Sequence, residues 1–164
     1  MTSTEQQKPL FDLKKWTHFL ALGFGSGLAP KAPGTFGTLA AVPLIYLQSL
    51  ISPQFGLIWV LFAFVLGCYV CGQTAKDIGE HDHGAIVWDE VAGFCLAMWC
   101  IPFQWQYLLI GFLLFRFFDI VKPWPIRVLD KKVHGGFGIM IDDMLAGFFS
   151  WLILFALVQY QAFS

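Results

Sequence analysis

The stretch IMIDDMLAGFF, Ile139 to Phe149, places two adjacent aspartates inside an almost wholly apolar run. An ionised carboxylate is costly to remove from water, so Asp142 and Asp143 need a partner or a place near the membrane surface. The residues that follow, Met144 to Ser164, contain no charged side chain. Because roughly 20 apolar residues can cross a bilayer as a helix, the stretch predicts a membrane helix that begins at two acids.

The composition of the whole chain also points to a membrane protein. Of its 164 residues, 57% are hydrophobic and only 13% are charged, whereas about a quarter of the residues in soluble domains are charged. The net charge of −1 gives no case for a nucleic-acid partner. We therefore expect an all-α, polytopic integral membrane bundle of about four to five spans. It would form a single domain over residues 1–164, with a polar N-terminal tail at 1–15.

Charge-free stretches and prolines delimit the candidate spans, which are about Thr38–Ile51, Phe55–Thr74, Asp89–Ile101, Trp105–Val121, and the aspartate pair to Tyr160. The first and third are short for a full crossing and are expected to be tilted or recessed. The apolar, glycine-rich segment Trp16–Leu28 is expected to lie on the membrane or dip into it. If the spans alternate in direction, every lysine and arginine falls on one side, which the positive-inside rule makes cytoplasmic. The acids fall on the same side.

Four motifs meet at this predicted cytoplasmic face, and the first is GFGSGLAPKAPGTFGT, Gly23 to Thr38. Its glycines and prolines disfavour a regular helix and leave backbone N–H groups free to line an anion site. Lys31 is its only charged residue, which makes it a candidate for binding a phosphate. The alternative is a flexible loop at the membrane interface.

The second motif, HDHGAIVWDEVAGF, places Asp89 and Glu90 before an Ala-Gly-Phe, as the first stretch does with Asp142 and Asp143. Acids at a helix start can act simply as caps. However, small residues allow close helix packing, so the four carboxylates are predicted to converge around a cation. Oxygen ligands favour Mg²⁺, Mn²⁺ or Ca²⁺ over zinc. His81 and His83 of the same motif are expected to be solvated loop residues.

The third motif, RFFDIVKPWP, spaces Arg116, Asp119 and Lys122 three residues apart, so that successive pairs share a helix face. Ionisable residues at the end of a membrane span are expensive and indicate function. The alternative is a structural Arg116–Asp119 pair with Lys122 extending to the lipid headgroups.

The fourth motif, GGFGIMIDD, puts a glycine-rich lead-in before the aspartates, which predicts that they lie at a chain reversal. His134, just before it, is expected to be only a loop residue. The remaining cysteine pattern, Cys68 and Cys71 as C-x-x-C, is expected to be apolar and buried in a helix rather than a zinc or redox site.

A metal ion with arginine and lysine is the equipment of phosphoryl transfer, because it neutralises charge on the phosphoryl oxygens. A metal can also lower the pKa of a water that attacks, or an aspartate can attack and form an acyl-phosphate. The sequence leaves both routes open. The predicted catalytic residues are Asp119, Arg116 and Asp143; the predicted phosphate-binding residues are Lys31, Arg116 and Lys122; the predicted metal ligands are Asp89, Glu90, Asp142 and Asp143. A site at headgroup level predicts a phosphorylated lipid substrate.

Taken together, APKAPGTFGT, IVWDEVAG, RFFDIVKPWPI and GGFGIMIDDMLAG occur in this order between Gly25 and Gly147, and the chain resembles the phosphatidylglycerophosphatase A family. The resemblance implies an all-helical, Mg²⁺-dependent phosphatase of the bacterial inner membrane. The implied reaction is hydrolysis of phosphatidylglycerophosphate to phosphatidylglycerol and inorganic phosphate. The implied functional positions are Lys31, Asp89, Glu90, Arg116, Asp119, Lys122, Asp142 and Asp143.

Three other classes of protein compete with this interpretation. A phosphatidyltransferase would carry D-G-x-x-A-R followed by G-x-x-x-D-x-x-x-D, which the sequence lacks. A small transporter or proton channel would use intramembrane acids as an ion relay, but would need them near mid-membrane on several spans. An assembly subunit would have acids of purely structural use. The oligomeric state is not indicated by the sequence.

Overall fold

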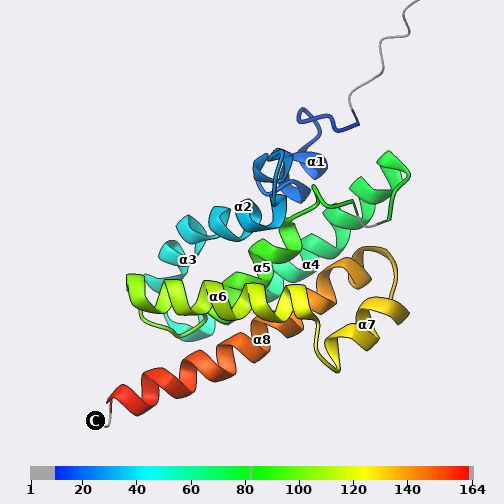
Figure 1. Cartoon of the computed structure of the whole chain (residues 1–164). Helices are drawn as coiled ribbons and strands as arrows, with labels where there is room; N and C mark the ends of the chain where they lie inside the picture. The colour runs from blue at the N-terminus through cyan, green and yellow to red at the C-terminus, as the bar shows by residue number, and fades with distance from the viewer. Residues whose placement is uncertain (1–9, 82, 163–164) are drawn as a thin grey trace, which may run out of the picture.

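The computed structural model describes residues 10–81 and 83–162. Its helices are α1 Trp16–Ala21, the short 3₁₀ helix η1 Ser26–Leu28, α2 Pro33–Ala40, α3 Val42–Ser49, α4 Pro53–Ile78, α5 Trp88–Ala97, α6 Trp105–Val121, α7 Ile126–Lys132 and α8 Gly135–Ala162 (Figure 1). The described ranges contain no strand, which confirms the all-α prediction.

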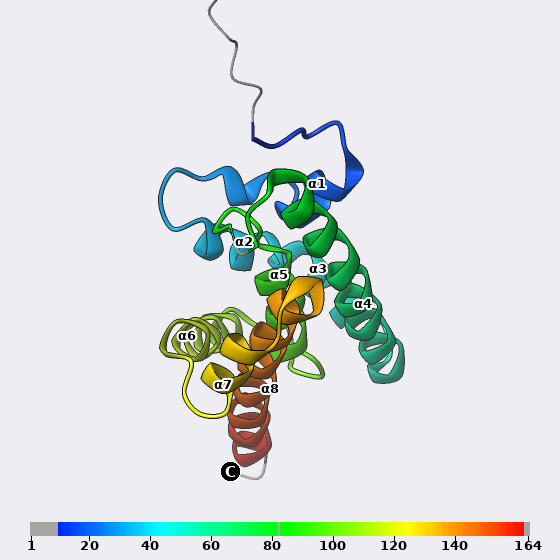
Figure 2. The ribbon, with the colours of Figure 1, turned by 90° about the vertical axis from the view of Figure 1, so that its right-hand side faces the viewer.

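The long helix α8 forms the spine of the bundle and packs against α4, α5, α6 and α7. Figure 2 shows the short helices α1 to α3 gathered on the side of α5 away from α8. Helix α5 lies between these layers, and Val91, Phe94 and Cys95 on it are at most 1% exposed. The core is therefore centred on α5, and the residues at the start of this helix are held on several sides.

Glycines allow α8 to pack closely against both α5 and α4. A Cβ on Gly147 of α8 would overlap the carbonyl oxygen of Gly93 on α5. A Cβ on Gly136 would likewise overlap the carbonyl oxygen of Cys68 on α4. Small residues at helix crossings permit this close approach, as predicted for the Ala-Gly patches.

Within the described residues, two helices are long and apolar enough to cross a bilayer, namely α4 and the part of α8 from Gly135 to Tyr160. Only 39% and 33% of their most apolar windows are buried, whereas a core helix of a soluble protein would be mostly buried. Exposed side chains such as Ile58 and Val65 face outward from α4. Apolar surface of this extent is energetically favourable in lipid rather than in water, so the fold supports membrane association.

The predicted segment Thr38–Ile51 is not one continuous helix. Helix α2 ends at Ala40 and α3 begins at Val42, because Pro43 lacks an N–H and its ring clashes with the preceding turn. The predicted segment Asp89–Ile101 is shortened to the ten residues of α5. At about 1.5 Å per residue, α5 covers about half of a bilayer core.

The start of α8 also differs from the prediction. The helix begins at Gly135, so Asp142 and Asp143 lie two turns inside it and its first turn holds no acid. Of the three glycines before the aspartates, only Gly135 has a left-handed backbone, with φ +76°. Gly136 lies within the helix, where its lack of a side chain allows α4 to pack against α8.

Other predicted segments agree better with the structure. Helix α6 coincides with Trp105–Val121, and α4 extends the predicted Phe55–Thr74 at both ends. The segment Trp16–Leu28 forms only the short pieces α1 and η1.

The predicted polar tail is described only in part, because residues 1–9 lie outside the described ranges. At its end, Lys15 pairs with Asp77 of α4 at 3.2 Å. The last residue of the tail is therefore tied to the end of α4.

The cysteines of the C-x-x-C pattern lie within α4 and are free thiols. Cys71 is completely buried, and Cys68 is partly buried. Both positions agree with the predicted role as apolar helix residues.

Candidate active site

A cavity of about 160 Å³ lies where α5 begins, α6 ends and α7 meets α8. Its lining contains six carboxylates and one lysine: Asp89, Glu90, Asp119, Asp130, Asp142, Asp143 and Lys122. The remaining lining residues are His81, Gly84, Ile86, Val133, Gly138 and Ile139. The second, third and fourth motifs, which are separate in the sequence, therefore all line one cavity.

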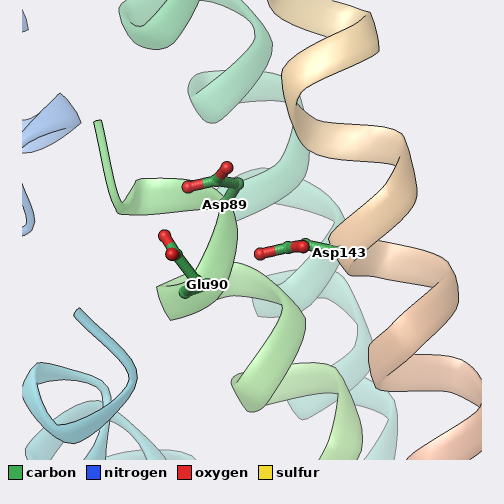
Figure 3. Close-up of side chains that lie close together, drawn as sticks. All are labelled: Asp89, Glu90 and Asp143. Atoms are coloured by element: carbon green, nitrogen blue, oxygen red, sulfur yellow. The ribbon is translucent and has the colours of Figure 1, made fainter. Parts of the chain in front are cut away.

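Three of these carboxylates form the centre of the cavity. Asp89 and Glu90 lie in the first turn of α5, and Asp143 points toward them from α8 (Figure 3). One oxygen from each lies within 4.8 Å of the others. Asp89 is 9% exposed and Asp143 is 3% exposed. We call Asp89, Glu90 and Asp143 the carboxylate triad.

The close helix crossing explains why the triad converges. Asp89 precedes Gly93 by four residues, and Asp143 precedes Gly147 by four residues. Residues four apart share a helix face, so the contact between the two glycines turns the two aspartates toward each other. The repeated D-x-x-x-G spacing is thus a packing device that builds the site.

The triad has the chemistry of a hard-cation site. Three carboxylates this close repel one another when ionised. Glu90 Oε2 and Asp143 Oδ2 are buried, and neither has a hydrogen-bond partner among the described residues. Oxygen atoms of this kind fit a divalent ion such as Mg²⁺. Helix capping does not explain Asp143, because that residue lies far from the first turn of α8.

Asp142, the fourth predicted metal ligand, has a different neighbour. Its Oδ2 accepts a hydrogen bond from Lys122 Nζ at 2.5 Å, and Asp130 Oδ1 accepts a second from the same ammonium at 2.6 Å. Burial alone would lower the pKa of Lys122, but these bonds outweigh it and raise that pKa above the ordinary value. Lys122 is therefore a fixed cation at the rim of the cavity, bridging two acids.

Arg116 and Asp119 complete the site from α6. Arg116 Nη1 lies 2.6 Å from Asp119 Oδ2 and 3.7 Å from Glu90 Oε1. The arginine is 17% exposed, so it is a largely desolvated cation between α6 and the triad. The Arg116–Asp119 pair of the structural alternative does form, and it forms beside the cavity.

A comparison with known protein families identifies the family of this chain. The family model described as Phosphatidylglycerophosphatase A matches residues 19–158. The chain belongs to the phosphatidylglycerophosphatase A family. The match confirms the resemblance drawn from the four motifs, and with it the prediction of a phosphatase of phospholipid metabolism. The predicted alternatives of a transporter, a phosphatidyltransferase and an assembly subunit are not supported.

Individual relatives extend over most of the chain. A protein named Phosphatidylglycerophosphatase A from Haemophilus influenzae is 52% identical over 145 residues, which cover 87% of this chain and 88% of that protein. A protein of the same name from Escherichia coli is 51% identical over 139 residues, which cover 84% of this chain and 81% of that protein. A relative from Bacteroides thetaiotaomicron is 36% identical over 145 residues, covering 82% and 89%, and its name provisionally describes a phosphatidylinositol-3-phosphatase. No solved structure matches the chain.

The glycine-rich motif of this phosphatidylglycerophosphatase A family member was expected not to form a regular helix, but its end forms the start of α2, because a proline is tolerated in the first turn of a helix. The motif reaches the site through the backbone of this helix. A Cβ on Gly34, at the start of α2, would overlap Glu90 Oε1 and lie 3.0 Å from Arg116 Nη1. Lys31, the predicted phosphate ligand of this loop, is exposed and is not part of the cavity lining. The structure thus brings the loop to the triad at Gly34.

Two lining residues were not predicted for the site. Asp130 was missed because it lies on α7, and no spacing in the sequence links it to Lys122. His81 is exposed, as expected of a solvated residue, but it also lines the cavity, where its Nε2 accepts a hydrogen bond from the Gly135 N–H at 2.6 Å. Neither Gly84 nor Gly135 indicated this role of His81 in the sequence, because the contact depends on α8 beginning at Gly135.

Proposed function

We propose that this protein hydrolyses phosphatidylglycerophosphate to phosphatidylglycerol and inorganic phosphate, in a reaction that requires Mg²⁺. The observation that carries the proposal is the convergence of Asp89, Glu90 and Asp143 beside the Arg116–Asp119 pair. The names of the relatives from Haemophilus influenzae and Escherichia coli support the choice of lipid.

The triad would hold the metal ion, since its oxygens are close together, buried and in part without hydrogen-bond partners among the described residues. When bound, Mg²⁺ would neutralise charge on the phosphoryl oxygens and lower the pKa of a water. Asp142 remains a predicted ligand, although it would have to share its carboxylate with Lys122. Arg116 and Lys122 would attract phosphate oxygens, and Lys31 would contribute from the loop.

The reaction breaks the bond between phosphorus and the terminal glycerol oxygen. An oxygen from water forms the new bond to phosphorus, and a proton passes to the departing glycerol oxygen. Asp119 is the residue we assign to this step, because Arg116 holds its carboxylate at the cavity. Asp119 would either accept the proton of the attacking water or attack phosphorus itself and form an acyl-phosphate that water then hydrolyses.

These two roles of Asp119 differ in whether phosphate becomes attached to the protein. Rapid acid quenching of a reaction with substrate labelled in its terminal phosphate would trap an acyl-phosphate, and the label would be absent from Asp119→Asn. A wild-type protein that turns over without trapped label would assign Asp119 to proton transfer.

The membrane setting of the proposal is the bacterial inner membrane, with the cavity on the cytoplasmic side. The cavity lies at one end of α6, next to the basic residues of α7, and the positive-inside rule favours the cytoplasm for such an end. The apolar outer surfaces of α4 and α8 would face lipid. A lipid substrate could then enter sideways at headgroup level.

Phosphate release by purified protein in detergent tests the function. We expect release from phosphatidylglycerophosphate with Mg²⁺ and none with excess chelator. Asp143→Asn should lower kcat by at least about 100-fold, whereas Glu80→Gln, at an exposed acid outside the cavity, should not. Full turnover by Asp143→Asn, or in the presence of chelator, would overturn the proposal.

A further inference from the structure

A second hollow lies beside the catalytic cavity, along α7. It has a volume of about 420 Å³ and is lined by Val121, Lys122, Pro123, Trp124, Arg127, Val128, Lys131 and Lys132. We call it the α7 groove. Among the described residues, its lining contains four cations and no acid, in contrast to the carboxylate-rich cavity, and Lys122 belongs to both.

The positive charge of the α7 groove is largely uncompensated. Arg127, Lys131 and Lys132 form no ion pair with any residue in the described parts of the chain. The one acid of the same helix, Asp130, is bonded to Lys122 on the cavity side. Three unpaired cations on a seven-residue helix produce a positive potential that attracts anions.

The groove also has an apolar wall. Trp124 is 82% exposed and Val121 is 54% exposed, and both line the groove together with Val128. A free inorganic anion gains nothing from exposed tryptophan and valine. A lipid headgroup does, because its phosphate meets the cations while its glycerol and upper acyl carbons cover the apolar side chains. Tryptophan is also typical of the headgroup level of membranes.

We propose that the α7 groove binds the phosphodiester of a glycerophospholipid and thereby positions the terminal phosphate of the substrate in the catalytic cavity. The substrate part of this inference rests on the proposed function. Phosphatidylglycerophosphate carries a diester and a terminal monoester joined by a glycerol. Two adjoining sites that share Lys122 match this pair of phosphates: the groove takes the diester, and the cavity takes the monoester.

Binding of the product lipid separates the groove from catalysis, because phosphatidylglycerol keeps the diester and lacks the monoester. The probe is phosphatidylglycerol with brominated acyl chains, added to the full chain in neutral detergent, with quenching of tryptophan fluorescence as the readout. Brominated phosphatidylcholine is the comparison lipid, since its choline cancels the headgroup charge. We expect wild type to bind phosphatidylglycerol more tightly than phosphatidylcholine.

The variant Arg127→Gln/Lys131→Gln/Lys132→Gln should lose this preference, with phosphatidylglycerol affinity falling at least about tenfold, since each cation near an anionic lipid contributes to binding. The matched control Lys14→Gln/Lys76→Gln removes two exposed cations elsewhere and should keep the preference. Trp124→Phe should keep binding but lose the part of the quenching specific to phosphatidylglycerol.

Retention of the preference by the triple variant would overturn the inference. Displacement of the lipid by inorganic phosphate at equal concentration would also overturn it, because the groove would then be a site for free phosphate. Phosphate release by the wild type in the same preparation tests the proposed function separately. In that assay the triple variant should lose activity mainly through a higher KM, as expected for a residue set that binds substrate.

Discussion

Lys122 Nζ lies 2.5 Å from Asp142 Oδ2, which joins the end of α6 to α8 two turns after α8 begins. Lys122 itself has a left-handed backbone, with φ +44°, at the turn that leads to α7. The same ammonium also binds Asp130 on α7. One side chain therefore fixes the relative positions of three helices at the edge of the catalytic cavity.

Replacing this lysine should cost both stability and activity. Lys122→Met leaves the largely buried Asp142 without its cation, and we expect a loss of about 2 kcal/mol in the free energy of unfolding, because an unpaired buried charge is unfavourable. Phosphate release should fall as well. Denaturation in detergent measures the stability. The double variant Lys122→Met/Asp142→Asn should recover much of the lost stability. If the stability losses of the two single variants instead added up in the double variant, the two residues would not be coupled.

The stabilising effect of Lys122 should not vary between about pH 7 and pH 9. Burial lowers the pKa of Lys122, but the bonds to Asp130 and Asp142 outweigh burial and raise the pKa above its ordinary value of 10.5. A raised pKa means that the stabilisation is fully present below the unfolded value and is lost only when the pH rises through the folded value. The stability difference between wild type and Lys122→Met, measured across this range, should be flat. A marked decline before pH 9 would contradict the assignment.

Adding a methyl group at Gly34 should disturb the triad although no charged residue is replaced. In Gly34→Ala the new Cβ would displace the Glu90 carboxylate. We expect the Mg²⁺ concentration for half-maximal activity to rise about tenfold, as is typical when a group that orients a metal ligand is altered. Gly56→Ala is the control, because its Cβ would meet only ordinary contacts with Trp99 and Gln48. An unchanged Mg²⁺ dependence in Gly34→Ala would be evidence against Glu90 as a ligand.

Binding of Mg²⁺ should stabilise the fold independently of substrate. A ligand that binds only the folded state at 100 times its Kd contributes about 2.7 kcal/mol. When thermal unfolding is measured at increasing Mg²⁺ concentrations, the Tm of the wild type should therefore rise. Asp143→Asn should show a much smaller rise, and Glu80→Gln should behave as wild type. Equal stabilisation of Asp143→Asn would place the ion elsewhere.

The helix crossing should tolerate no added side chain. In Gly147→Ala the new methyl group would overlap the Gly93 carbonyl oxygen, so we expect a loss of about 1–3 kcal/mol in stability. Activity should fall further than stability alone explains, because α5 and α8 each carry part of the triad. Ala156→Ser adds one heavy atom at an exposed position of α8 and should leave Tm and activity unchanged. Wild-type behaviour of Gly147→Ala would show that the crossing is looser than described.

Much of the helical pattern could be predicted because strong local signals bound it. Helix α6 lies between Pro102 and Pro123, and its predicted ends agree with the structure. The start of α8 could not be predicted in this way. Glycines disfavour a helix when exposed, but Gly136 is required by its contact with α4. A local propensity was overridden by tertiary packing that a single sequence does not display.

The site was predictable to the extent that its residues are unusual for their surroundings. Acids and cations in apolar segments indicated function, and six of those predicted to act at the site line the cavity: Asp89, Glu90, Asp119, Lys122, Asp142 and Asp143. Asp130 lies on a short polar helix, where an acid is ordinary, and so gave no signal. The different neighbours of Asp142 and Asp143 were also not predictable, because they depend on where the other helices pack.

Adjacent residues on an α-helix point about 100° apart. This offset directs Asp142 toward Lys122 and Asp143 toward the other two carboxylates of the triad. Any insertion or deletion of a single residue between Gly135 and Asp142 would rotate both side chains at once, away from the triad and from Lys122. The length of these first two turns of α8 is therefore constrained by both aspartates. Length variation among homologous sequences should be tolerated before Gly135 or after Tyr160, and rejected in the seven residues that set the phase of the helix.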